Sequence, residues 1–219
     1  KVADFTEVEF DKADIEIEER EPVFSGYFRV DRYRLRHRLF AGGWSDSMGR
    51  EVFERGHAVA VILYDPDLDR LVLIHQFRVG ALAALNSEPH LEGAFTPWLL
   101  EVVAGIIDDG ESPETVARRE AVEEAGCEIS QIEPVCRFLL SPGVTSESIT
   151  LFCGRVQAHA VGGIHGLDAE HEDIRVFTVA VDEAFRWLDE GRFANATALI
   201  AMQWFRLNHA ALRRRWCGG

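Results

Sequence analysis

One segment constrains the chain more than any other: residues 105–127 combine a glycine turn with a short, carboxylate-rich helix. Ser112 followed by Pro113 is typical of a helix start, with serine as the N-cap and proline at the first helical position. Gly126 stands where a left-handed glycine commonly ends a helix. The sequence therefore predicts a helix over residues 113–125.

Three carboxylates share one face of this predicted helix. Glu120 and Glu124 are four residues apart, and Glu123 is three residues from Glu120. Like charges at this spacing repel and weaken an isolated helix. Carboxylate oxygens are the ligands that Mg²⁺ or Mn²⁺ prefers, so a cation would turn the repulsion into binding energy. Gly105 allows a tight backbone passage ahead of the helix, and Arg119 can orient the glutamates.

The alternative interpretation is a solvated acidic helix face. For glutamates considered alone it is the more common outcome, because charged side chains usually stay exposed. The whole chain is acidic, with 23 Lys and Arg against 37 Asp and Glu, a formal charge of −14. This charge argues against a nucleic-acid polymer as partner, since phosphate backbones are bound by clustered basic residues. A small phosphorylated ligand stays compatible if a cation mediates its binding.

Hydrophobic periodicity predicts a β-rich N-terminal part followed by a mixed part. Residues 1–55 alternate charged and apolar positions, which is typical of half-exposed antiparallel strands. A meander of this size has little core of its own and must pack on something. Beyond it, compact strands are expected over 58–64, 71–74, 98–103, 138–140, 149–152 and 174–181, and helices over 182–189 and 195–215.

Two long loops interrupt this second part. Residues 81–94 contain Asn, Ser, Pro and Gly, and residues 158–173 contain three glycines. Loops of this length are usually functional or peripheral. The acidic run around Glu170 and Glu172 would, by itself, more often be a solvated loop, and Trp98 is expected in the core.

The cysteines show no metal-binding or disulfide spacing, which indicates reduced, mostly buried thiols. No apolar run is long enough to span a membrane, and the N-terminus shows no signal peptide. We therefore expect a cytoplasmic protein.

The segment from Gly105 to Cys127 resembles the Nudix box. That motif consists of Gly, five residues, Glu, seven residues, Arg-Glu, an apolar residue, any residue, Glu-Glu, any residue, Gly and an apolar residue. Every fixed position is filled here, and Cys127 in the final apolar slot is a mild departure. The resemblance implies a Nudix hydrolase, which splits a nucleoside diphosphate linked to a further moiety.

The similarity extends over nearly the whole chain to bacterial ADP-ribose pyrophosphatases of this family. It is carried by Gln76-Phe77-Arg78, Pro97 to Glu101, Ser141-Pro142-Gly143 and Glu170 to Val176, and by the N-terminal stretch 50–57. Residues 81–94 are the exception, since this connection is longer than in the relatives. The resemblance implies Mg²⁺-dependent hydrolysis of ADP-ribose to AMP and ribose 5-phosphate, with two or three ions and Mn²⁺ as a substitute.

The resemblance also implies roles for individual residues. The metal ligands fall on the backbone carbonyl of Ala104 and on Glu120, Glu124 and Glu172. The general base falls on Glu170, and Arg119 and Glu123 of the box are assigned to the catalytic machinery. The expected substrate contacts are Tyr27, Phe28, Arg50, Glu51, Arg55, Arg78, Ile106, Ser141, Pro142, Gly143 and Glu147.

We therefore expect an α/β protein with the Nudix fold, a mixed curved sheet sandwiched by helices, over residues 56–219. A small antiparallel β domain over residues 1–55 is expected to bind adenosine and to form a homodimer. The first rival hypothesis keeps the chemistry and changes the substrate to a nucleotide sugar, NADH or a dinucleoside polyphosphate. The second is a non-catalytic Nudix domain that binds a nucleotide as a regulator; such a protein would be expected to lose box carboxylates.

Overall fold

The structure is a computed structural model that describes residues 10–217, and it contains two compact units. The first unit is the chain up to Gly56 together with Ser141–Glu147, and the second comprises His57–Leu140 and Ser148–Gly219. The turn around Ser141, which we expected within the larger domain, thus belongs to the N-terminal unit. No helix among residues 10–217 has the length and apolar character required to cross a bilayer.

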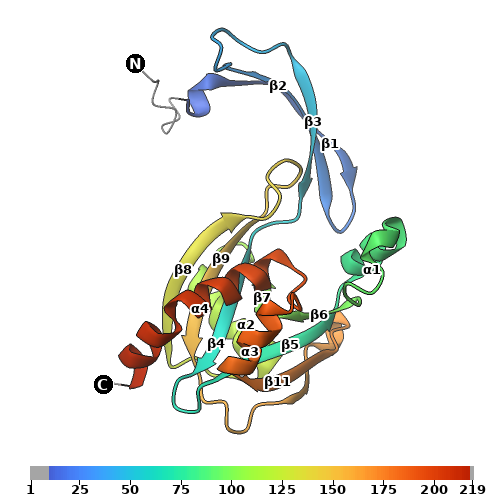
Figure 1. The fold of residues 1–219 in the computed structure, drawn as a ribbon. Helices are drawn as coiled ribbons and strands as arrows, with labels where there is room; N and C mark the ends of the chain where they lie inside the picture. The colour runs from blue at the N-terminus through green and yellow to red at the C-terminus, as the bar shows by residue number, and fades with distance from the viewer. Residues whose placement is uncertain (1–9, 218–219) are drawn as a thin grey trace. The chain divides into compact units, whose positions relative to one another are not determined.

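The first unit is a three-stranded antiparallel sheet, as the alternating pattern predicts. Its strands are β1 (Ile15–Ser25), β2 (Arg29–His37) and β3 (Met48–Glu54), in the order β1-β2-β3 (Figure 1). Every residue of β1 is exposed, including Ile17 and Phe24. Asp31 on β2 is buried and pairs with two arginines, so the sheet carries ion pairs more than a hydrophobic core.

The second unit is built on an eight-stranded mixed sheet. Its path is β10-β11-β5-β4-β9-β8, with β6 paired to β5 and β7 to β4. Only the pairing of β4 with β9 is parallel among these. The strands are β4 (Ala58–Asp65), β5 (Arg70–Phe77), β6 (Trp98–Glu101), β7 (Val103–Ile106), β8 (Gln131–Leu139), β9 (Ser148–Arg155), β10 (Gly163–His165) and β11 (Ile174–Ala180).

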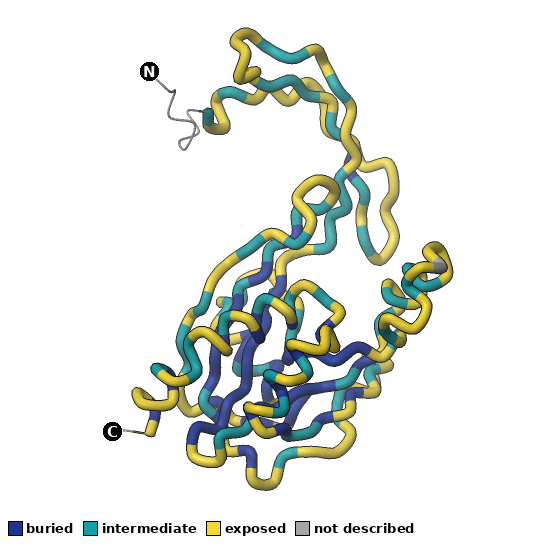
Figure 2. Tube along the Cα trace, viewed as in Figure 1, coloured by how far each residue is buried: buried dark blue, intermediate teal, exposed yellow. Residues whose placement is uncertain are grey.

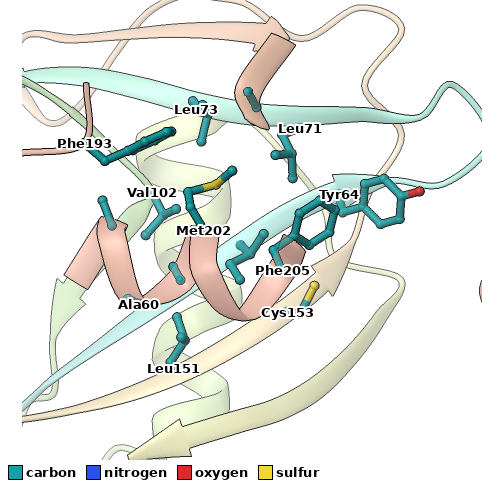
Figure 3. Packing of buried hydrophobic residues seen from close by; sticks show 14 of the residues in the cluster. Ala60, Tyr64, Leu71, Leu73, Val102, Leu151, Cys153, Phe193, Met202 and Phe205 are labelled. Atoms are coloured by element: carbon teal, nitrogen blue, oxygen red, sulfur yellow. The ribbon is translucent and has the colours of Figure 1, made fainter. Parts of the chain in front are cut away.

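Helices cover both faces of this sheet, which confirms the expected sandwich. The central strand β4 is buried at every position, as Figure 2 shows in dark blue. Its alternate residues serve two cores: Tyr64 packs with residues of α3 (Val181–Asp189) and α4 (Ala196–Cys217), and Val61 packs with residues of α2 (Pro113–Ala125). In Figure 3 Tyr64 lies against Phe205 of α4, with ring centroids 5.0 Å apart. Burial on both faces explains why β4 is a continuous apolar run.

Three local expectations were wrong. Residues 81–94 are largely helical, since α1 spans Val79–Ser87 and a 3₁₀ turn spans Pro89–Leu91; the alanines and leucines of α1 favour helix, whereas our prediction weighed the later Pro and Gly. Trp98 is 57% exposed, because β6 begins there and its ring packs on Phe77 at the sheet edge. The predicted strand over 98–103 divides at Val102 into β6 and β7.

The cysteines fit the expectation in part. All four are free, but Cys136 and Cys217 are exposed, so only half of them are buried.

Candidate active site

Helix α2 begins and ends where its capping residues predict. Ser112 accepts a hydrogen bond from the Thr115 amide at 3.2 Å, and Gly126 has a φ of 62°. Val116, Ala117 and Ala121 are fully buried against the sheet. This apolar face fixes the rotation of the helix, and therefore where its glutamates point.

Two of the box glutamates are buried, which the solvated-face alternative does not allow. Glu124 is 2% exposed and Glu120 is 9% exposed. The Ala104 amide donates a hydrogen bond to Glu124 Oε2 at 3.1 Å, so β7 and α2 meet at this carboxylate. Burial raises the pKa of Glu120 to about 7 and that of Glu124 to about 8, and the charge of Glu172 adds to both rises. The pair therefore lies where a positive charge would be strongly favoured.

Gly105 makes this packing possible. A Cβ built on Gly105 would lie 2.0 Å from Glu120 Oε1 and 2.1 Å from its Cδ. No side chain fits in that space, so the glycine of the motif is required by the close approach of the backbone to Glu120.

Arg119 binds three glutamates of the box, two of which it was expected to orient. Its Nη1 donates to Glu120 Oε1 at 2.8 Å and to Glu123 Oε2 at 2.9 Å, and Nη2 donates to Glu111 at 3.2 Å. Burial alone would lower the pKa of Arg119, but the hydrogen bonds to Glu111 and Glu123 outweigh it and raise that pKa. One guanidinium thus organises three carboxylates of the motif.

The glycine-containing segment 158–173 carries β10 and a 3₁₀ turn, Asp168–Glu170. Glu172 is held there by two donors: the Leu167 amide at 3.2 Å and the Gln76 side chain at 3.5 Å. A Cβ on Gly166 would lie 2.6 Å from Glu172 Cβ, so this segment too needs a glycine for close packing. Glu170, the expected base, is exposed.

Segment 158–173 contacts helix α2, which carries the box glutamates. The Gly166 amide donates to the Glu123 carbonyl at 3.4 Å, and Glu172 contributes to the field at the two buried glutamates. Within residues 10–217, however, no three His, Cys, Asp or Glu side chains form a group that could hold a metal ion. The expected ligands Glu120, Glu124 and Glu172 act on one another electrostatically but do not form such a group.

Arg78 lies at the start of α1 and pairs with a buried carboxylate. Its Nη2 is 2.7 Å from Glu101 Oε2, and its Nε is 3.1 Å from the same oxygen. Burial lowers the pKa of Arg78, but Glu101 outweighs that effect, and Glu124 and Glu172 contribute to the rise. The guanidinium thus lies in the field of the candidate ligands.

Ile106, another expected substrate contact, lies at the end of β7 and is 37% exposed.

The other expected substrate contacts belong to the first unit. Phe28 packs edge-on against Tyr27, and the Arg55 guanidinium lies 5.8 Å from the Phe28 ring centroid. Arg55 Nε is also 3.5 Å from Glu147, which is buried. Tyr27 itself is 89% exposed, so its ring is open to a ligand.

Arg50 and Glu51 stand exposed on β3, where Glu51 pairs with Arg32 at 3.0 Å. The carbonyl of Ser141 closes its turn by accepting from the Val144 and Thr145 amides, and Pro142 and Gly143 are exposed at the tip. These residues are assembled in the first unit and the box residues in the second.

Three polar residues that contact Arg78, Glu172 or each other in the second unit were assigned no functional role in our sequence analysis: Gln76, Glu101 and Asn195. Gln76 and Glu101 are 7% and 4% exposed; Gln76 lies near the end of the largely buried strand β5, and Glu101 ends the otherwise apolar strand β6. A charged or amide residue interrupting a buried strand is a signal that could have indicated them. Asn195, just before a long helix, could have been identified only as an N-cap.

The arrangement defines a class of protein. The NUDIX domain family model matches residues 54–216, which is well over half of the chain, so the chain belongs to the NUDIX domain family. The expected family and fold are thereby confirmed.

Particular relatives are close. The chain is 48% identical over 209 residues to the ADP-ribose pyrophosphatase of Escherichia coli (strain K12), covering 95% of this chain and 96% of that protein. It is 42% identical over 207 residues to the ADP-ribose pyrophosphatase of Haemophilus influenzae, covering 94% and 93%. Among solved structures, the crystal structure of an ADP compounds hydrolase superposes with a TM-score of 0.66 at 20% identity, covering 91% of this chain and 97% of that one, which supports the fold.

Proposed function

We propose that this protein is an ADP-ribose diphosphatase that hydrolyses ADP-ribose to AMP and ribose 5-phosphate. The observation that carries the proposal is the 42–48% identity to ADP-ribose pyrophosphatases over almost the whole chain, with every fixed position of the box filled. The complete set of box carboxylates disfavours a non-catalytic nucleotide-binding role.

Mg²⁺ is the proposed cofactor, and the donor set fits it. Glu120, Glu124 and Glu172 and the carbonyl of Ala104 are proposed to share two or three ions, so that no single ion needs all three carboxylates. All are hard oxygen donors, and the two buried glutamates have raised pKa values that a cation would reverse. Mg²⁺ is usually bound by one or two carboxylates together with water and substrate phosphates, so a closed protein cage is not required. When bound, it would neutralise the diphosphate and activate water, and Mn²⁺ could replace it.

The chain's own residues supply the rest of the chemistry. Glu170 is proposed to accept a proton from the attacking water, whose oxygen bonds to one phosphorus while the bridging P–O bond breaks. Its exposure on the segment anchored by Glu172 leaves it free to approach a bound substrate. Arg119 is proposed to keep Glu120 and Glu123 oriented, and Arg78 to contact the phosphates.

Recognition of the adenosine is proposed to fall to the first unit. Tyr27 and Phe28 offer aromatic faces for the base, and Arg55 offers a cation beside Phe28. Arg50 and Glu51, exposed on β3, are proposed to add charged contacts to the same part of the substrate. The turn at 141–143, Glu147 and Ile106 are proposed to contact the remainder of the substrate.

We also propose that the protein is a homodimer in the cytoplasm. The apolar side chains of β1, such as Ile17 at 56% and Phe24 at 59% exposed, favour burial against a second copy. Sedimentation at micromolar concentration tests this, and a monomer would contradict it.

The decisive assay is hydrolysis of ADP-ribose with Mg²⁺ in ¹⁸O-labelled water, with a nucleotide sugar, NADH and a dinucleoside polyphosphate in parallel. Formation of AMP and ribose 5-phosphate, with label in one of them, is expected, and the labelled product identifies the attacked phosphorus. Faster turnover of another compound would instead favour the rival substrate class.

A further inference from the structure

Glu101 is a buried carboxylate that collects donors from two distant parts of the second unit. Glu101 is 4% exposed, and on one side it accepts hydrogen bonds from Nε and Nη2 of Arg78. On the other side, the Asn195 side-chain amide donates to Glu101 Oε1 at 2.7 Å. A carboxylate has acceptor capacity for both donors and donates nothing, so it can join two donor groups that would not bond each other.

Asn195 connects this pair to a rigid element. Its Oδ1 accepts from the Ala198 amide at 2.7 Å, so it is the N-cap of the 22-residue helix α4. That bond fixes which way the side-chain amide faces: its NH₂ group must point to Glu101. Helix α4 in turn packs on the central strand through Phe205 and Met202, which are fully buried.

Arg78 lies at one end of the three side chains that are linked by these hydrogen bonds. Glu101 engages one edge of its guanidinium, and 40% of the side chain remains exposed. An unrestrained arginine carries about 2 kcal/mol of rotamer entropy, which it would lose on binding a phosphate. Holding the guanidinium in place beforehand removes part of that cost and favours one direction of approach for the anion.

We infer that Glu101 and Asn195 are positioning residues that hold Arg78 towards the substrate and connect substrate binding to the N-terminus of α4. The inference rests on the proposed function, in which Arg78 contacts the diphosphate. Neither residue touches the substrate; both act through the orientation of one guanidinium.

Two substitutions separate this role from simple support of the fold. Glu101→Gln replaces one acceptor oxygen with an NH₂ group, which must face a donor of either Arg78 or Asn195. Asn195→Ser keeps a good helix N-cap but removes the amide that reaches Glu101. We expect each variant to raise the KM for ADP-ribose about tenfold, the effect of losing one charge-assisted hydrogen bond. The Kd of a non-cleavable ADP-ribose analogue, measured by calorimetry with Mg²⁺ present, should rise by the same factor. The kcat should change less than threefold, and Asn195→Ser should melt close to the wild type.

Glu133→Gln is the matched control. Glu133 accepts from Arg215 at 2.5 Å and from the Trp216 indole at 3.0 Å, so it too joins an arginine and a neutral donor on α4. It lies on β8, outside the candidate site, and its substitution should leave KM and Kd unchanged. In an Arg78→Lys background, Glu101→Gln should add little further loss, because both changes remove the same interaction.

The outcomes are distinct. A wild type that does not hydrolyse ADP-ribose overturns the proposed function itself. A wild type that does, with KM and Kd in Asn195→Ser and Glu101→Gln within twofold of normal, overturns the positioning role alone. So does an equal change in Glu133→Gln, since that would indicate a general loss of stability. If Glu101→Gln does not fold, Asn195→Ser decides the question.

Discussion

Substitution of Glu124 by glutamine should stabilise the metal-free protein while abolishing the proposed metal-dependent activity. The carboxylate is 2% exposed and accepts the Ala104 amide, a bond that a glutamine oxygen can also accept. What the substitution removes is the titratable charge. The side chain keeps nearly the same shape, so the packing of α2 on β7 should persist.

The magnitude follows from the pKa of Glu124, which burial raises from 4.5 to about 8. Because the folded protein holds this proton more tightly than the unfolded chain, raising the pH above 4.5 ionises the unfolded chain first. Stability from this group is therefore lost between about pH 4.5 and 8, and the loss levels off above that range. At pH 7.5 the cost is at most about 4 kcal/mol, and at pH 5 it is about 1 kcal/mol.

Calorimetric melting in EDTA measures the difference. At pH 7.5 the Glu124→Gln variant should melt roughly 5–15 °C above the wild type, and at about pH 5 the two should differ by only a few degrees. Glu128→Gln is the matched control, because Glu128 is an exposed glutamate just beyond the end of α2. Its substitution should leave the melting temperature unchanged at both pH values.

Two results would refute the reasoning. One is a Glu124→Gln variant that is no more stable than the wild type at pH 7.5 in EDTA. The other is a gain in stability that is the same at pH 5, since the charge of Glu124 would then not be its cause. Addition of Mg²⁺ should raise the melting temperature of the wild type more than that of the variant.

Three further predictions concern the same site. Gly105→Ala would bring a Cβ within 2.0 Å of Glu120, so activity should fall at least about 100-fold and the melting temperature should drop; kinetics near wild type would contradict the packing argument. Glu170→Gln should lower kcat by a factor of roughly 10² to 10⁴ with little change in melting temperature, and unchanged turnover would exclude Glu170 as the base. Ser112→Ala removes the N-cap of α2 and should cost about 1 kcal/mol, or roughly 2–4 °C in a thermal melt, whereas an unchanged melt would mean that the cap contributes nothing.

Local patterns in the sequence determined much of the outcome. The bounds of α2, the shared face of Glu120 and Glu124 and the antiparallel N-terminal sheet all follow from rules that act over a few residues: capping, helical spacing and alternation. The family could also be predicted, because the box is a fixed spacing within one segment. Helix α1 was missed because turn-forming residues further along outweighed its alanines and leucines in our prediction.

Only the tertiary structure decided how deeply the glutamates are buried and what holds Arg78. Burial of Glu120 depends on the close approach of β7 at Gly105, and burial is what raises its pKa. Glu101 meets Arg78 across 23 residues of chain and Asn195 across 94. Such contacts depend on which distant segments the hydrophobic cores bring together, and no short-range pattern contains that information.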